Sequence, residues 1–195
     1  MKNYSFRTCL MVAGLTLATT AFANVTEDAG YVDLGKFTAA DGCEYVEVNI
    51  KSGLLKFAAK IAAIHEPEAA ELLINIKLVR VNVVGMDDTN RKDTVGRITA
   101  IRADLETKGW EKIVTVREGK DKKGHKGDDV AVYIKTASED AISGVVVTVM
   151  EKNGEAIIVN IVGHIRAEQI ADLGERLDIK ELRRLKISTK AEAGA

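Results

Sequence analysis

Three closely spaced aspartates, Asp87, Asp88 and Asp93, are the first residues in this sequence whose type and spacing suggest metal chemistry. A hard cation such as calcium prefers oxygen ligands of this kind. However, the spacing is not that of the twelve-residue calcium loop, and no glutamate is placed to act as the bidentate ligand. We therefore expect a solvated loop, with a helix N-cap near Asp93 or Thr94.

A weaker cation candidate consists of Asp128 and Asp129 beside His125. Four lysines in the same connection oppose cation binding by their charge: Lys120, Lys122, Lys123 and Lys126. The whole connection from 119 to 128 is rich in charge and glycine, and we expect it to be exposed.

The three histidines, His65, His125 and His164, give no metal-ligand pair at the usual spacings. His65 closes an expected helix, and His164 ends an expected strand. The sequence assigns no catalytic, cofactor-binding or metal-binding residue and predicts no cofactor. The alternative is an enzyme, hydrolase-like, whose site assembles from scattered residues such as Asp87, Asp88 and His164.

Cys43 is the one cysteine that remains if the N-terminal segment is removed, because Cys9 lies within that segment. It then has no partner for an intrachain disulfide. We expect it to be a small, buried apolar side chain. An intermolecular disulfide and a reactive thiol are the alternatives, but the neighbouring acids Asp41, Glu44 and Glu47 do not give the electropositive setting of a nucleophilic thiolate.

Residues 1–23 have the pattern of a signal peptide. Lys2 and Arg7 form a positive start, residues 8–20 are uncharged, and Ala21-Phe22-Ala23 is the small-x-small pattern that signal peptidase needs. The apolar run is too short for a lasting membrane anchor. The sequence therefore predicts a mature chain that starts at Asn24 and a periplasmic or secreted location.

The overall charge excludes one class of partner. The chain has a net charge of −1, and loss of Lys2 and Arg7 with the signal would make it −3. Such a chain lacks the basic surface of a nucleic-acid-binding protein. No later segment is apolar for long enough to span a membrane. The 46% apolar content can form a core in a single domain.

Alternating apolar residues and turn signals indicate the elements that must position these side chains. Strands are predicted at 44–51, 76–84, 111–118, 129–136, 145–151 and 155–163. A polar connection is expected at 137–143, and Asn153-Gly154 indicates a hairpin between the last two strands.

Helices are predicted at 54–64, 95–109 and 167–177, with a short one starting at Pro67 and a further turn at 182–185. Ser52 is placed to cap the first helix. The pattern predicts an α+β fold with a single mixed, mainly antiparallel sheet of about six strands and helices packed mostly on one face. The domain is expected at 41–187, after a loosely ordered lead-in at 24–40 and before a flexible tail at 188–195.

The last hairpin and the helix after it resemble a known family. Val145–Val149, Glu155–Ile165 and Gln169–Leu173 are similar to the domain-of-unknown-function 4252 family of exported bacterial proteins. The resemblance covers most of residues 40–186 and rests on apolar patterning and one glycine. It implies export and a shared fold, and it brings no catalytic residues.

These observations favour an exported, non-catalytic protein that binds a protein or envelope component. The charged connection at 119–128 or an open sheet edge is the expected contact surface. The oligomeric state is left open, with a Cys43-linked dimer as one possibility.

Overall fold

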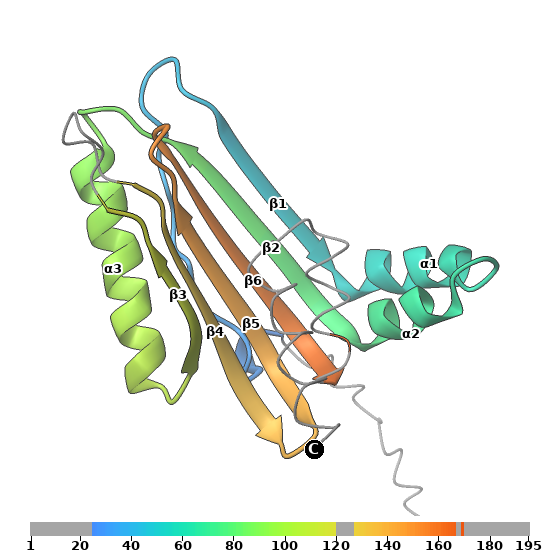
Figure 1. The fold of residues 1–195 in the computed structure, drawn as a ribbon. Helices are drawn as coiled ribbons and strands as arrows, with labels where there is room; N and C mark the ends of the chain where they lie inside the picture. The colour runs from blue at the N-terminus through green and yellow to red at the C-terminus, as the bar shows by residue number, and fades with distance from the viewer. Residues whose placement is uncertain (1–24, 120–126, 167–168, 170–195) are drawn as a thin grey trace, which may run out of the picture.

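The computed structural model describes residues 25–119, 127–166 and 169, and its architecture is one six-stranded sheet with three helices (Figure 1). The elements are a 3-10 turn (Val25–Glu27), β1 (Tyr45–Lys51), α1 (Ser52–Ala62), α2 (Pro67–Asn75), β2 (Ile76–Gly85), α3 (Arg91–Thr107), β3 (Glu111–Arg117), β4 (Asp129–Ser138), β5 (Ala141–Met150) and β6 (Glu155–Arg166). The strand order is β1-β2-β6-β5-β4-β3, and every neighbouring pair is antiparallel. The expected α+β fold is confirmed.

One face of the sheet, which we call the helix-covered face, packs against α3 and the segment that precedes β1. Ile98, Ile101 and Leu105 recur at helical spacing on α3 and bury that side of the helix. The core on this face consists of Val32, Leu34, Phe37, Val84, Met86, Ile98, Ile101, Leu105, Trp110, Ala131, Tyr133, Val146, Ala156 and Ile158.

The opposite face, which we call the aliphatic face, carries branched apolar side chains on neighbouring strands. Alternation along β5 and β6 sends Val145, Val147, Val159 and Ile161 to this side. The cluster of buried residues here consists of Leu55, Leu72, Ile76, Val132, Ile142, Val145, Val147, Val159, Ile161 and Ile165. Both faces of the central strands are therefore apolar.

Residues 25–40 are more tightly held than the expected loose lead-in. Beyond the short 3-10 turn the segment forms no regular element, yet Val32, Leu34 and Phe37 are buried in the core. Asn160 on β6 ties the segment to the sheet. Its Oδ1 accepts a hydrogen bond from the Val32 N–H at 3.1 Å, and its Nδ2 donates to the Gly30 carbonyl at 3.0 Å.

Two expected helix caps are wrong. α3 begins at Arg91, earlier than the cap expected at Asp93 or Thr94, and Thr94 is buried inside it. α1 begins at Ser52 itself, and no side chain caps it. Pro67 does start α2, because its fixed φ suits the first helical position.

The connection expected at 137–143 is also wrong, because β4 and β5 meet in a tight hairpin. β4 continues to Ser138 and β5 starts at Ala141, so Ile142 is buried rather than placed in a polar loop. The hairpin at Asn153-Gly154 is confirmed, and Gly154 has the positive φ of 95° that this turn favours.

Several expectations lie outside the described residues. They are the signal peptide at 1–23, most of the charged connection with His125, the helix at 167–177, the turn at 182–185 and the tail at 188–195. Within the described part of the chain, no helix has the length and apolar character needed to cross a membrane.

Candidate functional site

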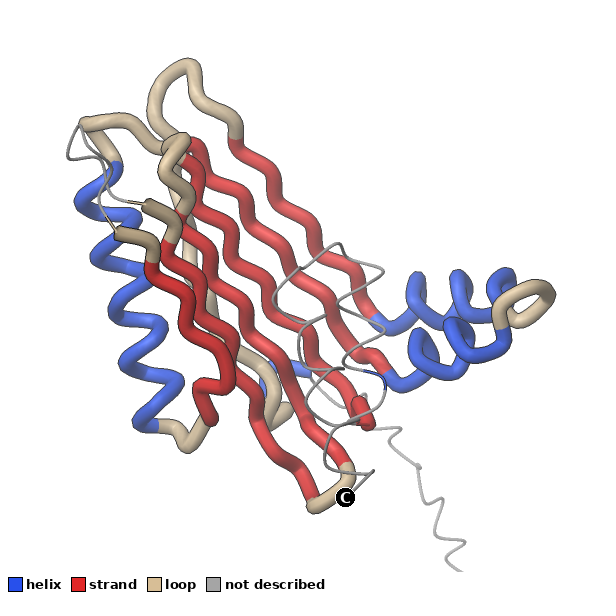
Figure 2. Tube along the Cα trace, viewed as in Figure 1, coloured by secondary structure: helices blue, strands red, loops and turns tan. Residues whose placement is uncertain are grey.

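A helical hairpin formed by α1 and α2 projects from the end of β1 and β2 (Figure 2). α2 continues into β2 without a loop, since Asn75 ends the helix and Ile76 begins the strand. The two helices pack through small and medium side chains. Those buried in the hairpin are Leu55, Ala59, Ala69, Ala70 and Leu72.

The hairpin carries a row of exposed apolar side chains. Leu54, Phe57 and Ile61 recur at helical spacing on α1 with exposed fractions of 57%, 61% and 57%, and Ile64 follows at 73%. Ile74 at the end of α2 is 56% exposed. We call these five residues the apolar row. Large exposed apolar patches mark interaction surfaces in soluble proteins.

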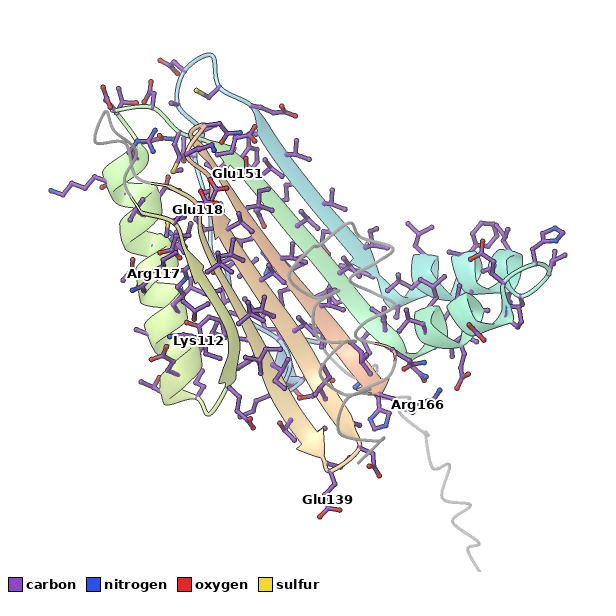
Figure 3. All side chains as sticks on the ribbon, in the orientation of Figure 1. Lys112, Arg117, Glu118, Glu139, Glu151 and Arg166 are labelled. Carbon is purple, nitrogen blue, oxygen red and sulfur yellow. The ribbon has the colours of Figure 1, made fainter. Side chains whose placement is uncertain are left out.

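Basic residues accompany the apolar row. Lys51, Lys56 and Lys60 are exposed, and no acid occurs between residues 51 and 65. The acids of the hairpin, Glu66, Glu68 and Glu71, lie in the turn before α2 or on α2. The carboxylate of Glu71 is paired with Arg166 of β6 at 2.9 Å, at the base of the hairpin (Figure 3). α1 is thus both apolar and cationic.

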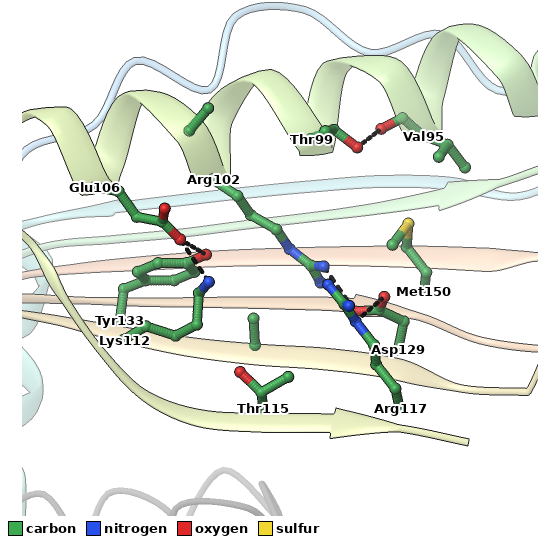
Figure 4. A pocket seen from close by; sticks show the side chains of 12 residues that line it. Val95, Thr99, Arg102, Glu106, Lys112, Thr115, Arg117, Asp129, Tyr133 and Met150 are labelled. Atoms are coloured by element: carbon green, nitrogen blue, oxygen red, sulfur yellow. Dashed lines mark hydrogen bonds and ion pairs between the residues drawn. The ribbon is translucent and has the colours of Figure 1, made fainter. Parts of the chain in front are cut away.

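A second candidate is a cleft of about 390 Å³ between α3 and the strands β3 and β4 (Figure 4). Arg102 reaches across it from α3, and Asp129 accepts a hydrogen bond from its guanidinium at 2.6 Å. Arg102 Nε also donates to Thr148 Oγ1 at 2.8 Å, and Arg117 lies 3.4 Å from Asp129. The charges in this half of the cleft are matched by partners within the fold.

Glu106, Lys112 and Tyr133 form a second network in the same cleft. Glu106 lies 2.5 Å from the Lys112 ammonium and accepts a 3.3 Å hydrogen bond from the Tyr133 hydroxyl. The Lys112 hydrogen bond lowers the pKa of Glu106, and the same contact raises the pKa of Lys112. Burial raises the pKa of Tyr133. All three pKa values move away from neutrality, whereas a general acid or base works best near the ambient pH.

The raised pKa of Tyr133 predicts a loss of stability in alkaline solution. The folded state holds the phenol neutral, so stability falls as the pH rises above the unfolded value of about 10. Tyr133→Phe removes this ionisation. Between about pH 9 and pH 11, the free energy of unfolding of this variant should therefore fall by less than that of the unchanged protein. Urea denaturation at both pH values measures this. Lys112, whose raised pKa acts in the same direction, remains in the variant, so parallel losses in the two proteins would contradict the prediction.

A larger hollow of about 790 Å³ adjoins this cleft and shares Val95, Asp129 and Met150 with it. Asp88 and Lys152 line this hollow. The neighbouring Asp87 is engaged in a turn, since it accepts hydrogen bonds from the Thr89 N–H at 2.7 Å and the Thr89 hydroxyl at 2.6 Å. The Thr89 hydroxyl lowers the pKa of Asp87.

The residues of the alternative enzyme site do not meet. The loop with Asp87 and Asp88 lies beside the β5–β6 turn, because the Met86 N–H donates to the Gly154 carbonyl at 2.6 Å. His164 is exposed near the other end of β6, about 30 Å away at the usual rise per strand residue. Among the described residues, no group of three or more His, Cys, Asp or Glu side chains is arranged to hold a metal ion.

The remaining sequence candidates occupy the ends and edges of the sheet. Cys43 is half-buried, with a free thiol, in the turn before β1. His65 is exposed at the tip of the helical hairpin. The edge strands are β1 and β3. Lys112 and Arg117 lie along β3 (Figure 3), and each is paired with an acid of the same chain.

Comparison with known proteins gives one match. The model of a family described as a domain of unknown function, DUF4252, matches residues 40–173. No curated protein matches. No solved structure matches either.

Proposed function

The chain belongs to the DUF4252 family of unknown function, and on that premise we propose that it is an exported, non-catalytic module that binds a component of the cell envelope through the α1–α2 hairpin. The observation that supports this role is the apolar row. Among the described residues, five of the six large apolar side chains that are exposed lie on this one hairpin. Side chains of this type are normally buried, and a cluster of them on a projecting element is typical of a contact surface.

The charged cleft supports the role less well. Its arginines and Lys112 are paired with acids of the same chain, and its shifted pKa values lie away from neutrality. A binding site for an outside ligand needs polar groups that are free to meet it. The residues suggested for the alternative enzyme do not form one site, because Asp87 and His164 lie near opposite ends of the sheet.

Export is the second part of the proposal, and it rests on residues 1–23. We expect the protein recovered from the envelope or the medium to begin at Asn24, after the Ala21-Phe22-Ala23 site. Intact-mass measurement of the isolated protein tests this. A chain that still begins at Met1 and remains in the cytosol would contradict export.

Site-specific photo-cross-linking tests the binding surface. A photoreactive phenylalanine analogue at position 57 should give an adduct in intact cells, because this ring projects from the hairpin. The matched control is the same analogue at Ala100, an exposed position on α3 away from the hairpin. Adducts at both positions to the same extent, or at Ala100 alone, would contradict a role for the hairpin.

A further inference from the structure

The geometry and charge of α1 point to a specific occupant, and we propose that the apolar row inserts into the surface of a lipid bilayer with anionic headgroups. This inference rests on the proposed function, because it names the envelope component that the hairpin binds. An interfacial helix of this kind lies flat on the membrane, with its apolar side in the acyl boundary and basic residues at headgroup level.

The apolar side of α1 has the composition that such insertion needs. Leu54, Phe57 and Ile61 lie on α1 over about 10 Å of helix, and Ile64 follows in the turn after α1. Each is more than half exposed, so transfer of these side chains into the acyl boundary removes apolar area from water. The row lies on an element that projects from the sheet (Figure 1), so α1 can approach a plane.

The positions of the lysines match the same surface. At about 100° per residue, Lys60 lies about 60° from Phe57 on the helix circumference, and Lys56 lies about 40° beyond Lys60. Lys51 adds a third cation directly before α1. A basic residue near an anionic membrane contributes about 1 kcal/mol of attraction. This local excess of positive charge contrasts with the net charge of −1 for the whole chain.

A second copy of the chain is a poorer occupant. In a two-fold dimer built on this row, α1 would meet α1, and residues 51–65 of each copy carry lysines without a single acid. The like charges would repel each other. The acids nearest in sequence, Glu66 and Glu68, precede or lie on α2, and Glu71 is already paired with Arg166.

Vesicle flotation with the purified exported protein tests the inference. We expect the protein to float with vesicles of phosphatidylglycerol and phosphatidylcholine, and to remain at the bottom of the gradient with phosphatidylcholine alone. Phe57→Ser/Ile61→Ser should abolish flotation, because it removes two apolar side chains from the row. Lys56→Glu/Lys60→Glu should weaken partitioning by at least about tenfold, because two attractive charges become repulsive.

The matched control is Lys92→Glu/Lys152→Glu, which makes the same change in net charge at exposed positions away from the hairpin. This variant should float as the unchanged protein does. A second readout uses Phe57→Trp, whose fluorescence should shift to the blue and be quenched by brominated lipid when the anionic vesicles are added. Trp110 is buried and provides an internal reference.

The outcomes separate this inference from the proposed function. An adduct at position 57 to a protein, with no flotation on anionic vesicles, would overturn the lipid inference and leave a binding role for the hairpin. A concentration-dependent dimer in sedimentation that Phe57→Ser/Ile61→Ser abolishes would overturn it in favour of a second copy. Equal flotation of the Lys56→Glu/Lys60→Glu variant and the unchanged protein would show that binding does not depend on attraction between these lysines and anionic headgroups. This result would overturn the inference.

Discussion

Replacement of Asn160 by leucine is expected to lower the free energy of unfolding by about 3 kcal/mol, because a buried side chain that joins two parts of the fold loses all its hydrogen bonds. Asn160 is fully buried on β6. Its side-chain oxygen accepts a hydrogen bond from the Val32 N–H at 3.1 Å. Its side-chain nitrogen donates to the carbonyls of Gly30 and Val145 at 3.0 and 3.3 Å. Leucine has a similar branched shape and leaves the groups of Gly30 and Val32 buried without these partners.

The same substitution should also loosen the segment before β1. Val32, Leu34 and Phe37 pack in the core of the helix-covered face, and Asn160 holds this segment against β6 through its hydrogen bonds to Val32 and Gly30. Thermal unfolding should show a midpoint lower by roughly 6–12 °C. Hydrogen exchange of the amides at 30–40 should accelerate in the variant more than exchange in β5.

Asn82 supplies a matched control on the same face of the neighbouring strand. It is also buried, but its Oδ1 accepts no hydrogen bond from the described residues, and its Nδ2 makes one 3.3 Å contact with the Tyr45 hydroxyl. Asn82→Leu should therefore change stability by less than about 1 kcal/mol, because an unpaired buried oxygen is removed with that contact. Equal losses from the two variants would show that burial of leucine, and not the bonds of Asn160, determines the effect.

The fold could be predicted from the sequence to the extent that it depends on local periodicity. Two-residue alternation and the Asn153-Gly154 turn identified the six strands, because both act between near neighbours. The strand order was not available from that pattern. β6 pairs with β5 through the local hairpin, but its other neighbour, β2, lies far earlier in the sequence, and local alternation does not encode that pairing.

The lead-in was misjudged for a related physical reason. Residues 28–40, beyond the 3-10 turn, form no strand, and their backbone is held partly by side chains such as Asn160 rather than by a strand ladder. A hydrogen bond over 128 residues of sequence leaves no local signature. The charged cleft was missed in the same way, because Arg102, Asp129 and Thr148 meet only when α3 packs on the sheet.

The apolar row did have a signal in the sequence. Helical spacing from Leu54 to Ile64 gives an apolar stripe that is wider than a single neighbouring helix can bury. Of this stripe, only the side with Leu55 and Ala59 is buried. The lysines without acids between 51 and 65 were equally visible. What the sequence did not indicate was that α1 projects from the sheet, because this depends on how α2 passes directly into β2.

Gly163 on β6 lies beside the junction of α2 and β2, where it pairs with Ile76. Gly163→Ala is expected to destabilise the protein by about 3 kcal/mol. A Cβ at this position would lie 2.5 Å from the Asn75 carbonyl oxygen and 2.8 Å from the Ile76 Cα. Both are backbone atoms, so no side chain can rotate away, and β2 must move relative to β6 where Ile76 pairs with Gly163. Urea denaturation should show a lower midpoint, and hydrogen exchange should increase at the start of β2.

Gly96 on α3 gives the opposite expectation and serves as the control. Apart from its chain neighbours and the backbone of its own helix, no atom lies within 4 Å of a Cβ built there, so Gly96→Ala should stabilise the protein by about 0.5–1 kcal/mol. Opposite signs for the two variants would show that close backbone approach, and not the loss of a flexible residue, makes glycine necessary at 163. If Gly163→Ala instead matches the unchanged protein in stability while floating less with anionic vesicles, the junction sets only the angle of the hairpin, and the packing argument for this glycine fails.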